Sequence, residues 1–124
     1  MVDSTRPRIR DATALLVGLE QELVETCGDV LGLLGFKVLK VGHAAAACER
    51  IPVAMPMLVV LHHDTKPEER AEVKERAIAV GAELVVAPNL PSPEDVVAVV
   101  REAGIAVLDR GPSVTRPPDN PRQD

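Results

Sequence analysis

The feature that most constrains the fold is an alternation between short, continuously apolar runs and longer segments with helical periodicity. The runs that are apolar at every position lie at residues 14–17, 57–61, 84–87 and 105–108. Such a run is typical of a strand that is buried on both faces of a sheet. A fifth run, 36–41, includes Lys37 and Lys40 and suits a strand near the sheet edge, where the lysines reach water.

Helical patterns fill the intervals between these runs. The clearest one places apolar residues at i, i+4, i+7, i+8 and i+11 from Leu23 to Leu34 and ends at Gly35. The fourth helical pattern, at about residues 93–103, begins at a Ser-Pro-Glu-Asp capping signal and is closed by Gly104. We expect the second and third helices at about residues 44–50 and 67–80. Five strands alternating with four helices predict a flavodoxin-like, doubly wound α/β fold with a parallel sheet of order 2-1-3-4-5.

The chain has room for one domain. It has 124 residues, 46% of them hydrophobic, and we place the folded part at residues 12–110. Residues 1–11 are rich in charge and residues 111–124 hold four prolines and almost no apolar side chain. We expect both ends to be disordered, because neither can bury enough apolar surface to offset its ordering entropy.

Charge and composition exclude several classes of function. The 14 Lys and Arg against 19 Asp and Glu give a net charge of −5, and basic residues cluster only in the short arm 6–10. We therefore expect no nucleic-acid partner. The apolar runs are far shorter than the roughly 20 residues of a membrane span, and we expect no membrane partner and a cytoplasmic protein. Cys27 and Cys48 have no metal-ligand spacing, and we expect them to be reduced core residues.

The order of the expected elements over about residues 12–110, together with three local strings, resembles the receiver domain of response regulators. "ALLVGLEQEL" is similar to the first strand and its loop, "LGLLGFKVLKVGHAAAACERI" to the stretch from the first helix into the second, and "PMLVVLHHDTKP" to the third strand and its loop. The resemblance implies the receiver fold and a role in signal transduction within a two-component system.

The same resemblance implies chemistry that this chain lacks. Receivers carry two acidic residues after strand 1 that hold Mg²⁺, an Asp acceptor after strand 3, a Ser or Thr after strand 4 and a Lys after strand 5. The corresponding positions here hold, in that order, Gly18 and Leu19 with Glu20 close behind, His62 or His63, Ala87 or Pro88, and Asp109 or Arg110. Forming an acyl phosphate needs a carboxylate nucleophile and a divalent cation, so we expect a pseudo-receiver without phosphotransfer.

A receiver also ends with a helix after strand 5, whereas this chain enters a proline-rich tail at Gly111. We therefore expect half of one sheet face to be bare and to be covered by a second copy, a partner helix or the tail. Interface candidates are Ile105 and Val107 on the last strand and Gly28 and Gly32 on the first helix. In a competing register, "GAELVVAPNLPSPEDVVAVVREAG" resembles strand 5 and helix 5 of a receiver, with one strand-helix unit deleted before it.

In open α/β sheets, ligands bind beyond the carboxyl ends of the strands, where the strand order reverses. That rule places a candidate ligand or partner cleft between strands 1 and 3, at Gly18, Leu19, Glu20, His62, His63 and Asp64. Imidazoles beside a carboxylate suit zinc or another transition metal, with His43 as a third donor. Adjacent histidines reach one ion only if the chain turns between them. The alternatives are hydrogen-bonded or solvated histidines and a pH-sensitive contact.

The sequence contains no nucleophile elbow, no P-loop and no Gly-x-Gly-x-x-Gly string, and we predict neither enzyme activity nor a cofactor. The function that we predict is a phosphorylation-independent, receiver-like signalling module that acts by protein–protein contact as a homodimer. The alternatives are a phosphoacceptor with a displaced acceptor such as Asp64, a small-molecule or metal sensor that uses the cleft, and a small enzyme.

Overall fold

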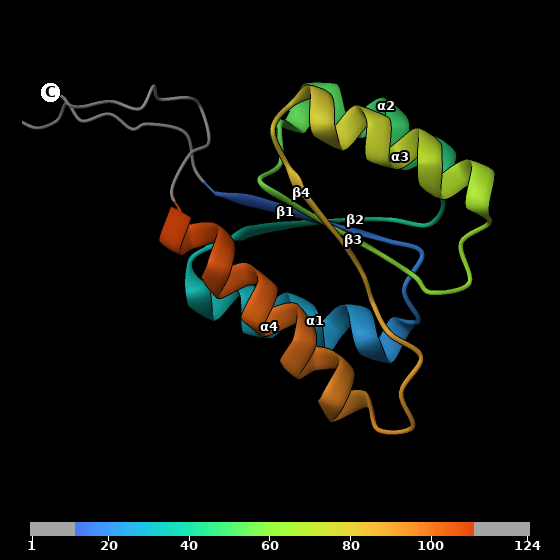
Figure 1. Ribbon diagram of the computed structural model, residues 1–124. Coiled ribbons are helices and arrows are strands. Elements are labelled where there is room, and N and C mark those ends of the chain that lie inside the picture. The colour runs from blue at the N-terminus through green and yellow to red at the C-terminus, as the bar shows by residue number, and fades with distance from the viewer. Residues whose placement is uncertain (1–11, 111–124) are drawn as a thin grey trace, which may run out of the picture.

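A computed structural model describes residues 12–110 as a four-stranded parallel sheet with helices on both faces (Figure 1). The sheet order is β2-β1-β3-β4, and each neighbouring pair of strands is parallel. The elements follow in the order β1 (Thr13–Val17), α1 (Gln21–Leu34), β2 (Lys37–Val41), α2 (Ala44–Ala54), β3 (Leu58–Leu61), α3 (Pro67–Ala79), β4 (Glu83–Val86) and α4 (Pro93–Arg110). The doubly wound α/β class is confirmed. The expected disorder of residues 1–11 and 111–124 concerns parts of the chain outside the described residues.

Two separate apolar layers hold the helices to the sheet. Side chains of a strand point alternately to its two faces, so Leu16 of β1 packs in the layer with α1 and α4, and Leu15 packs in the layer with α2 and α3. Figure 1 shows the pair α1 and α4 on one side of the sheet and the pair α2 and α3 on the other. All residues of β1 and β3 are buried, which is the reason that both strands are apolar at every position except Thr13.

Several local signals act as expected. Gly35 ends α1 with a left-handed φ of 107°, and the next residue, Phe36, donates its backbone N–H to the carbonyl of Leu31 at 3.0 Å. Pro67 occupies the first turn of α3, where its missing N–H has no helical partner to lose. The edge position of β2 is confirmed, and both of its lysines are exposed.

The predicted fifth strand at residues 105–108 is wrong, and so is the five-stranded order. These residues continue α4, which runs without a break from Pro93 to Arg110. The apolar run Ile105-Ala106-Val107-Leu108 fits a buried strand, but Val107 also extends the helical stripe of Val96, Val100 and Gly104. Packing of this stripe on the sheet decides in favour of the helix.

The sequence suggested that Gly104 ends the helix. In the structure it lies within α4 and allows α4 to approach α1. It is buried, and a Cβ atom at this position would lie 2.8 Å from Cδ2 of Leu31 and 3.3 Å from Cδ1 of Leu34. The glycines that the sequence offered as interface candidates, Gly28 and Gly32, make no such approach. A Cβ atom at Gly28 would meet Val38 at 3.8 Å, and one at Gly32 would meet nothing within 4 Å.

The expectation of a bare sheet face is also wrong, because α4 covers the face that α1 covers. Val107 is 3% exposed and belongs to the core of this face, so it offers no surface to a partner. Ile105 is half-buried on the same helix rather than on a strand. None of the helices in the described part of the chain combines the length and the apolar character that a membrane span requires.

Helix α2 is one turn longer than the expected 44–50 and contains Pro52. Proline removes one backbone hydrogen bond of the helix, but it lies in the last turn beside Ile51, which is completely buried and anchors that turn. The helix ends at Met55, whose backbone has a φ of 51° and a ψ of 55°. Residues other than glycine rarely adopt this left-handed conformation.

Candidate functional site

The candidate site lies at the carboxyl ends of β1, β3 and β4. Beyond β1, the backbone N–H of Gly18 donates to the carbonyl of Val41 at 2.9 Å, and beyond β3, the N–H of His62 donates to the carbonyl of Val17 at 3.2 Å. Gly18 has a φ of 70°, and a Cβ atom there would lie 3.9 Å from Cβ of His62. The hydrogen bonds of the sheet therefore hold the first residues of both loops in place.

A tight turn follows β3 and determines how the two histidines are presented. The carbonyl of His62 accepts the backbone N–H of Thr65 at 3.1 Å and the Thr65 hydroxyl at 2.7 Å. In addition, the backbone N–H of Asp64 donates to Nδ1 of His62 at 2.9 Å. A β-turn of this kind replaces the extended backbone in which adjacent side chains point to opposite sides.

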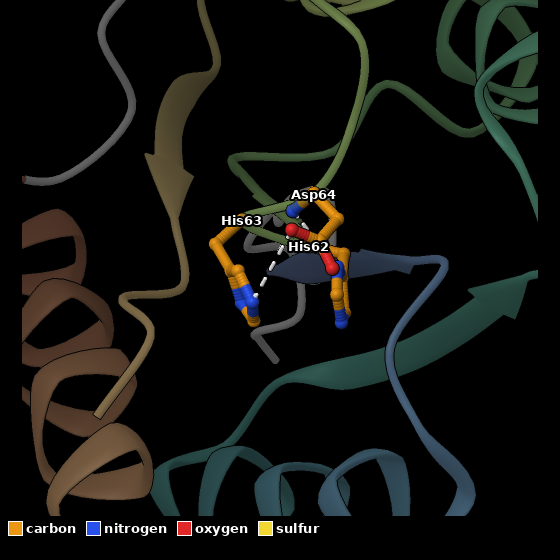
Figure 2. Close-up of side chains that lie close together, drawn as sticks. All are labelled: His62, His63 and Asp64. Carbon is orange, nitrogen blue, oxygen red and sulfur yellow. Dashed lines mark hydrogen bonds and ion pairs between the residues drawn. The ribbon is translucent and has the colours of Figure 1, made fainter. Parts of the chain in front are cut away.

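Because of this turn, the imidazole rings of His62 and His63 stack, with their centroids 4.3 Å apart and their planes 25° apart. Figure 2 shows both rings projecting to the same side of the turn, with Asp64 beside them. Nε2 of His63 lies 3.5 Å from Oδ1 of Asp64. One nitrogen or oxygen from each of these three residues lies within 4.8 Å of the others. The turn that two adjacent histidines need in order to approach one ion is thus present.

A pocket of about 180 Å³ opens beside the histidine pair. Of the residues expected in the cleft, Leu19, Glu20, His62 and His63 line it, Gly18 lies against His62, and Asp64 is exposed at its edge. The opposite wall consists of the loop after β4 and the start of α4. These residues were not named as cleft residues and include Ala87, Pro88, Asn89, Leu90, Pro91, Pro93 and Val96. The signal that could have found them is the strand order, because β4 pairs with β3 and their loops must leave the same edge of the sheet.

His43 does not join the cluster as the expected third donor. It is the N-cap of α2, and its Nδ1 accepts the backbone N–H of Ala46 at 3.2 Å. An N-cap side chain satisfies one of the amide groups that a helix start leaves without a partner, and this is the local reason for its position. Within residues 12–110, the histidines that come together are therefore His62 and His63.

The pocket is poor in the oxygen ligands that hard cations require. Glu20 is the one carboxylate among the residues that line it, and it is exposed at the start of α1. Mg²⁺ takes oxygen ligands with octahedral geometry, whereas imidazole nitrogen suits Zn²⁺, Ni²⁺ or Cu²⁺. The donor set at this edge of the sheet favours a transition metal over magnesium.

The two cysteines lie away from the pocket, in the two apolar layers. Cys27 on α1 is completely buried, and burial raises the pKa of its thiol from 9.0 to about 11. Burial also raises the pKa of Cys48 on α2, and the nearby carboxylate of Glu72 raises it further. Both are therefore thiols at neutral pH, as expected of reduced core residues.

No protein-family model matches the sequence, and no curated protein matches it either. Solved structures do match the fold. A de novo designed Rossmann 2x3 fold protein, solved by NMR in solution, is 12% identical with a TM-score of 0.57, over 86% of this chain and 96% of the design. A second de novo designed Rossmann fold protein is 17% identical with a TM-score of 0.53, over 77% of this chain and 98% of the design. At such low identity, the similarity shows a Rossmann-like or flavodoxin-like fold and nothing about function.

Proposed function

We propose that this chain is a receiver-like module that acts by protein contact and takes no phosphoryl group. The sheet order 2-1-3-4 supports the register in which one strand-helix unit of a receiver is missing before β4. In that register, α4 corresponds to the last helix of a receiver, which shares a sheet face with the first helix. The contact between α1 and α4 agrees with this assignment.

The composition of the pocket is the observation that carries the proposal. The position of the receiver's acidic pair holds Gly18 and Leu19, and the acceptor position holds His62. In the register with a missing unit, the position of the receiver's Lys after the last strand falls on Ala87, which is 3% exposed. Phosphoryl transfer to Asp depends on a carboxylate nucleophile and on cations that neutralise the phosphoryl oxygens. At the corresponding positions this chain has neither the acceptor Asp nor the acidic pair and the Lys.

Within residues 12–110, β4 has no strand on its outer side, and this edge supports self-association as the mode of contact. The N–H of Glu83 donates to Met57 at 2.9 Å and the N–H of Ala87 donates to Leu61 at 2.7 Å. Since N–H groups along a strand alternate in direction, those of Leu84 and Val86 point away from β3. Strand edges of this kind pair readily with a strand of another chain.

We propose a second copy of the chain as the source of a strand beside β4, and the position of α4 supports this choice. The connection from β1 to β2 uses the face of α1, whereas the connection from β3 to β4 proceeds in the opposite direction along the sheet and uses the face of α3. A strand that followed α4 and paired outside β4 would therefore need a left-handed crossover, which is very rare in parallel sheets. Two copies can instead pair β4 with β4 in antiparallel orientation and form one continuous sheet.

Incubation with acetyl phosphate and Mg²⁺, followed by intact-mass measurement, tests the phosphotransfer part of the proposal. We expect no mass increase by a phosphoryl group on the full chain. A stoichiometric increase that Asp64→Asn abolishes would contradict the proposal and favour a displaced acceptor. An increase that His62→Ala abolishes would assign phosphorylation to an imidazole and would contradict it equally.

Sedimentation equilibrium over a range of concentrations tests the dimer. We expect a dimer that Leu84→Lys weakens, because the substitution places a charge on the edge strand β4, where Leu84 is half-buried and packs in part against the layer with α2 and α3. An unchanged circular dichroism spectrum of this variant excludes unfolding as the cause. Leu33→Lys is the control for an added charge elsewhere, since Leu33 is 89% exposed on α1. A monomer at every concentration overturns the dimer. A dimer that Leu33→Lys disrupts, with Leu84→Lys unaffected, places the interface on α1 near Gly32 instead.

A further inference from the structure

The turn after β3 brings three potential metal ligands together from consecutive positions of the chain. His62, His63 and Asp64 would alternate in direction if the strand continued, but the hydrogen bond from Thr65 N–H to the His62 carbonyl closes a turn instead. Both rings then lie on one side of the turn (Figure 2). The hydrogen bonds that close the turn are all made among residues 62–65, from backbone and side-chain groups.

We propose that this turn, with His62, His63 and Asp64 as ligands, binds one divalent transition-metal ion of the zinc type. Zinc lies 2.0–2.2 Å from nitrogen and oxygen ligands in a tetrahedron, which places any two ligand atoms about 3.3–3.6 Å apart. Nε2 of His63 and Oδ1 of Asp64 already lie 3.5 Å apart. The three ligand atoms lie within 4.8 Å of one another, so rotation of side chains brings the third ligand to bonding distance.

Binding has a structural cost that the hydrogen bond of His62 defines. Nδ1 of His62 accepts the backbone N–H of Asp64, so the proton of the neutral ring lies on Nε2. A metal at Nδ1 would take the lone pair that this N–H uses. A metal at Nε2 would shift the ring proton to Nδ1, and this proton would then face the backbone N–H of Asp64. In both cases the hydrogen bond is lost, which reduces the affinity by about two- to tenfold relative to a turn without this bond.

His63 and Asp64 therefore form the primary pair, and His62 completes the site when the turn rearranges. The pocket beside the rings provides the space that a further ligand needs. It is lined by both histidines and by the carboxylate of Glu20. A fourth position open to water or to a small anion is typical of zinc sites that bind an external ligand. This site is independent of the contact along β4, and either proposal can fail without the other.

Calorimetric titration of the full, tag-free chain with Zn²⁺ tests the site, with Mg²⁺ as the contrasting ion. We expect one Zn²⁺ per chain and no binding of Mg²⁺. His63→Ala lowers the zinc affinity by at least about tenfold, and Asp64→Asn lowers it in the same direction. His43→Ala is the matched control, since this histidine caps α2 outside the cluster, and it leaves the zinc affinity unchanged.

NMR gives a second readout that a merely adventitious ion would not move. Because the Asp64 N–H loses its acceptor, its amide resonance shifts more on Zn²⁺ addition than the amides of α2 do. Binding that His63→Ala leaves unchanged, or that His43→Ala removes, overturns the proposal. Absence of binding at millimolar Zn²⁺ by a chain whose circular dichroism spectrum is that of a folded protein overturns it as well.

Discussion

Replacement of Gly104 by alanine tests the contact of α4 with α1. This contact distinguishes the four-stranded fold from the five-stranded one that the sequence predicted. Gly104 lies in the middle of α4, and an added Cβ atom would lie 2.8 Å from Leu31, whose side chain is completely buried. Gly32 on α1 offers a matched control, because an added Cβ atom there meets nothing within 4 Å. The same chemical change is thus made at a packed and at an open position of a helix.

The two substitutions should change the free energy of unfolding in opposite directions. Alanine is favoured over glycine by about 1 kcal/mol in a helix, and Gly32→Ala receives this gain in full. Gly104→Ala receives the same gain, but overpacking of a core costs about 1–3 kcal/mol. Its net effect is therefore a destabilisation of up to about 2 kcal/mol. The difference between the two variants, about 1–3 kcal/mol, measures the overpacking at the contact of α1 with α4.

Urea denaturation followed by circular dichroism measures both values, and thermal melting provides a second scale. For a domain of this size, 1 kcal/mol corresponds to a change of about 4–8 °C in the midpoint of melting. Gly104→Ala should melt below the wild type and Gly32→Ala above it. If Gly104→Ala were as stabilising as Gly32→Ala, α4 would not approach α1 at this point, and the assignment of residues 105–108 to a buried helix would lose its main support.

Three further predictions concern single residues. Burial raises the pKa of Cys27 to about 11, so the thiol of the unfolded chain loses its proton at a lower pH than the thiol of the folded chain. The free energy of unfolding should therefore fall above about pH 9, by up to about 1.4 kcal/mol per pH unit. Cys27→Ala should reduce this slope in urea titrations at about pH 8–11. His43→Ala removes the cap of α2 and should cost about 1 kcal/mol, whereas His43→Asn, which retains a capping oxygen, should cost less by the same measurement. Met55→Gly should raise the melting temperature, since Met55 is 42% exposed and has a left-handed conformation that costs a side chain about 1 kcal/mol; a lower melting temperature would contradict this reasoning.

Most strands and helices could be predicted from local apolar patterns, because the packing of the chain agrees with these patterns. The strands at 14–17, 57–61 and 84–87 and the helix that ends at Gly35 were predicted to within about one residue. The exception is the run 105–108, whose apolar residues fit a buried strand and a buried helix equally well. The deciding feature is the buried stripe of Val100, Gly104 and Val107, which extends over two turns of α4. A glycine within a helical pattern ends the helix or allows a close approach, and the sequence alone does not distinguish the two.

The candidate site could be predicted in its position but not in its geometry. The rule that ligands bind beyond the carboxyl ends of the strands correctly brought Glu20 and His62 to one pocket. The stacking of His62 on His63 depends on the turn to Thr65, and the loop that forms the opposite wall has no periodic pattern from which its position could be derived.

The two walls of the pocket are built in different ways. On one side, Gly18 and His62 continue the hydrogen-bond ladder of the sheet. On the other, the N–H of Ala87 also donates to the sheet, but residues 88–92 belong to no helix or strand. A ligand larger than the pocket would therefore displace residues 88–92 and the first turn of α4 more easily than the backbone of Gly18 and His62.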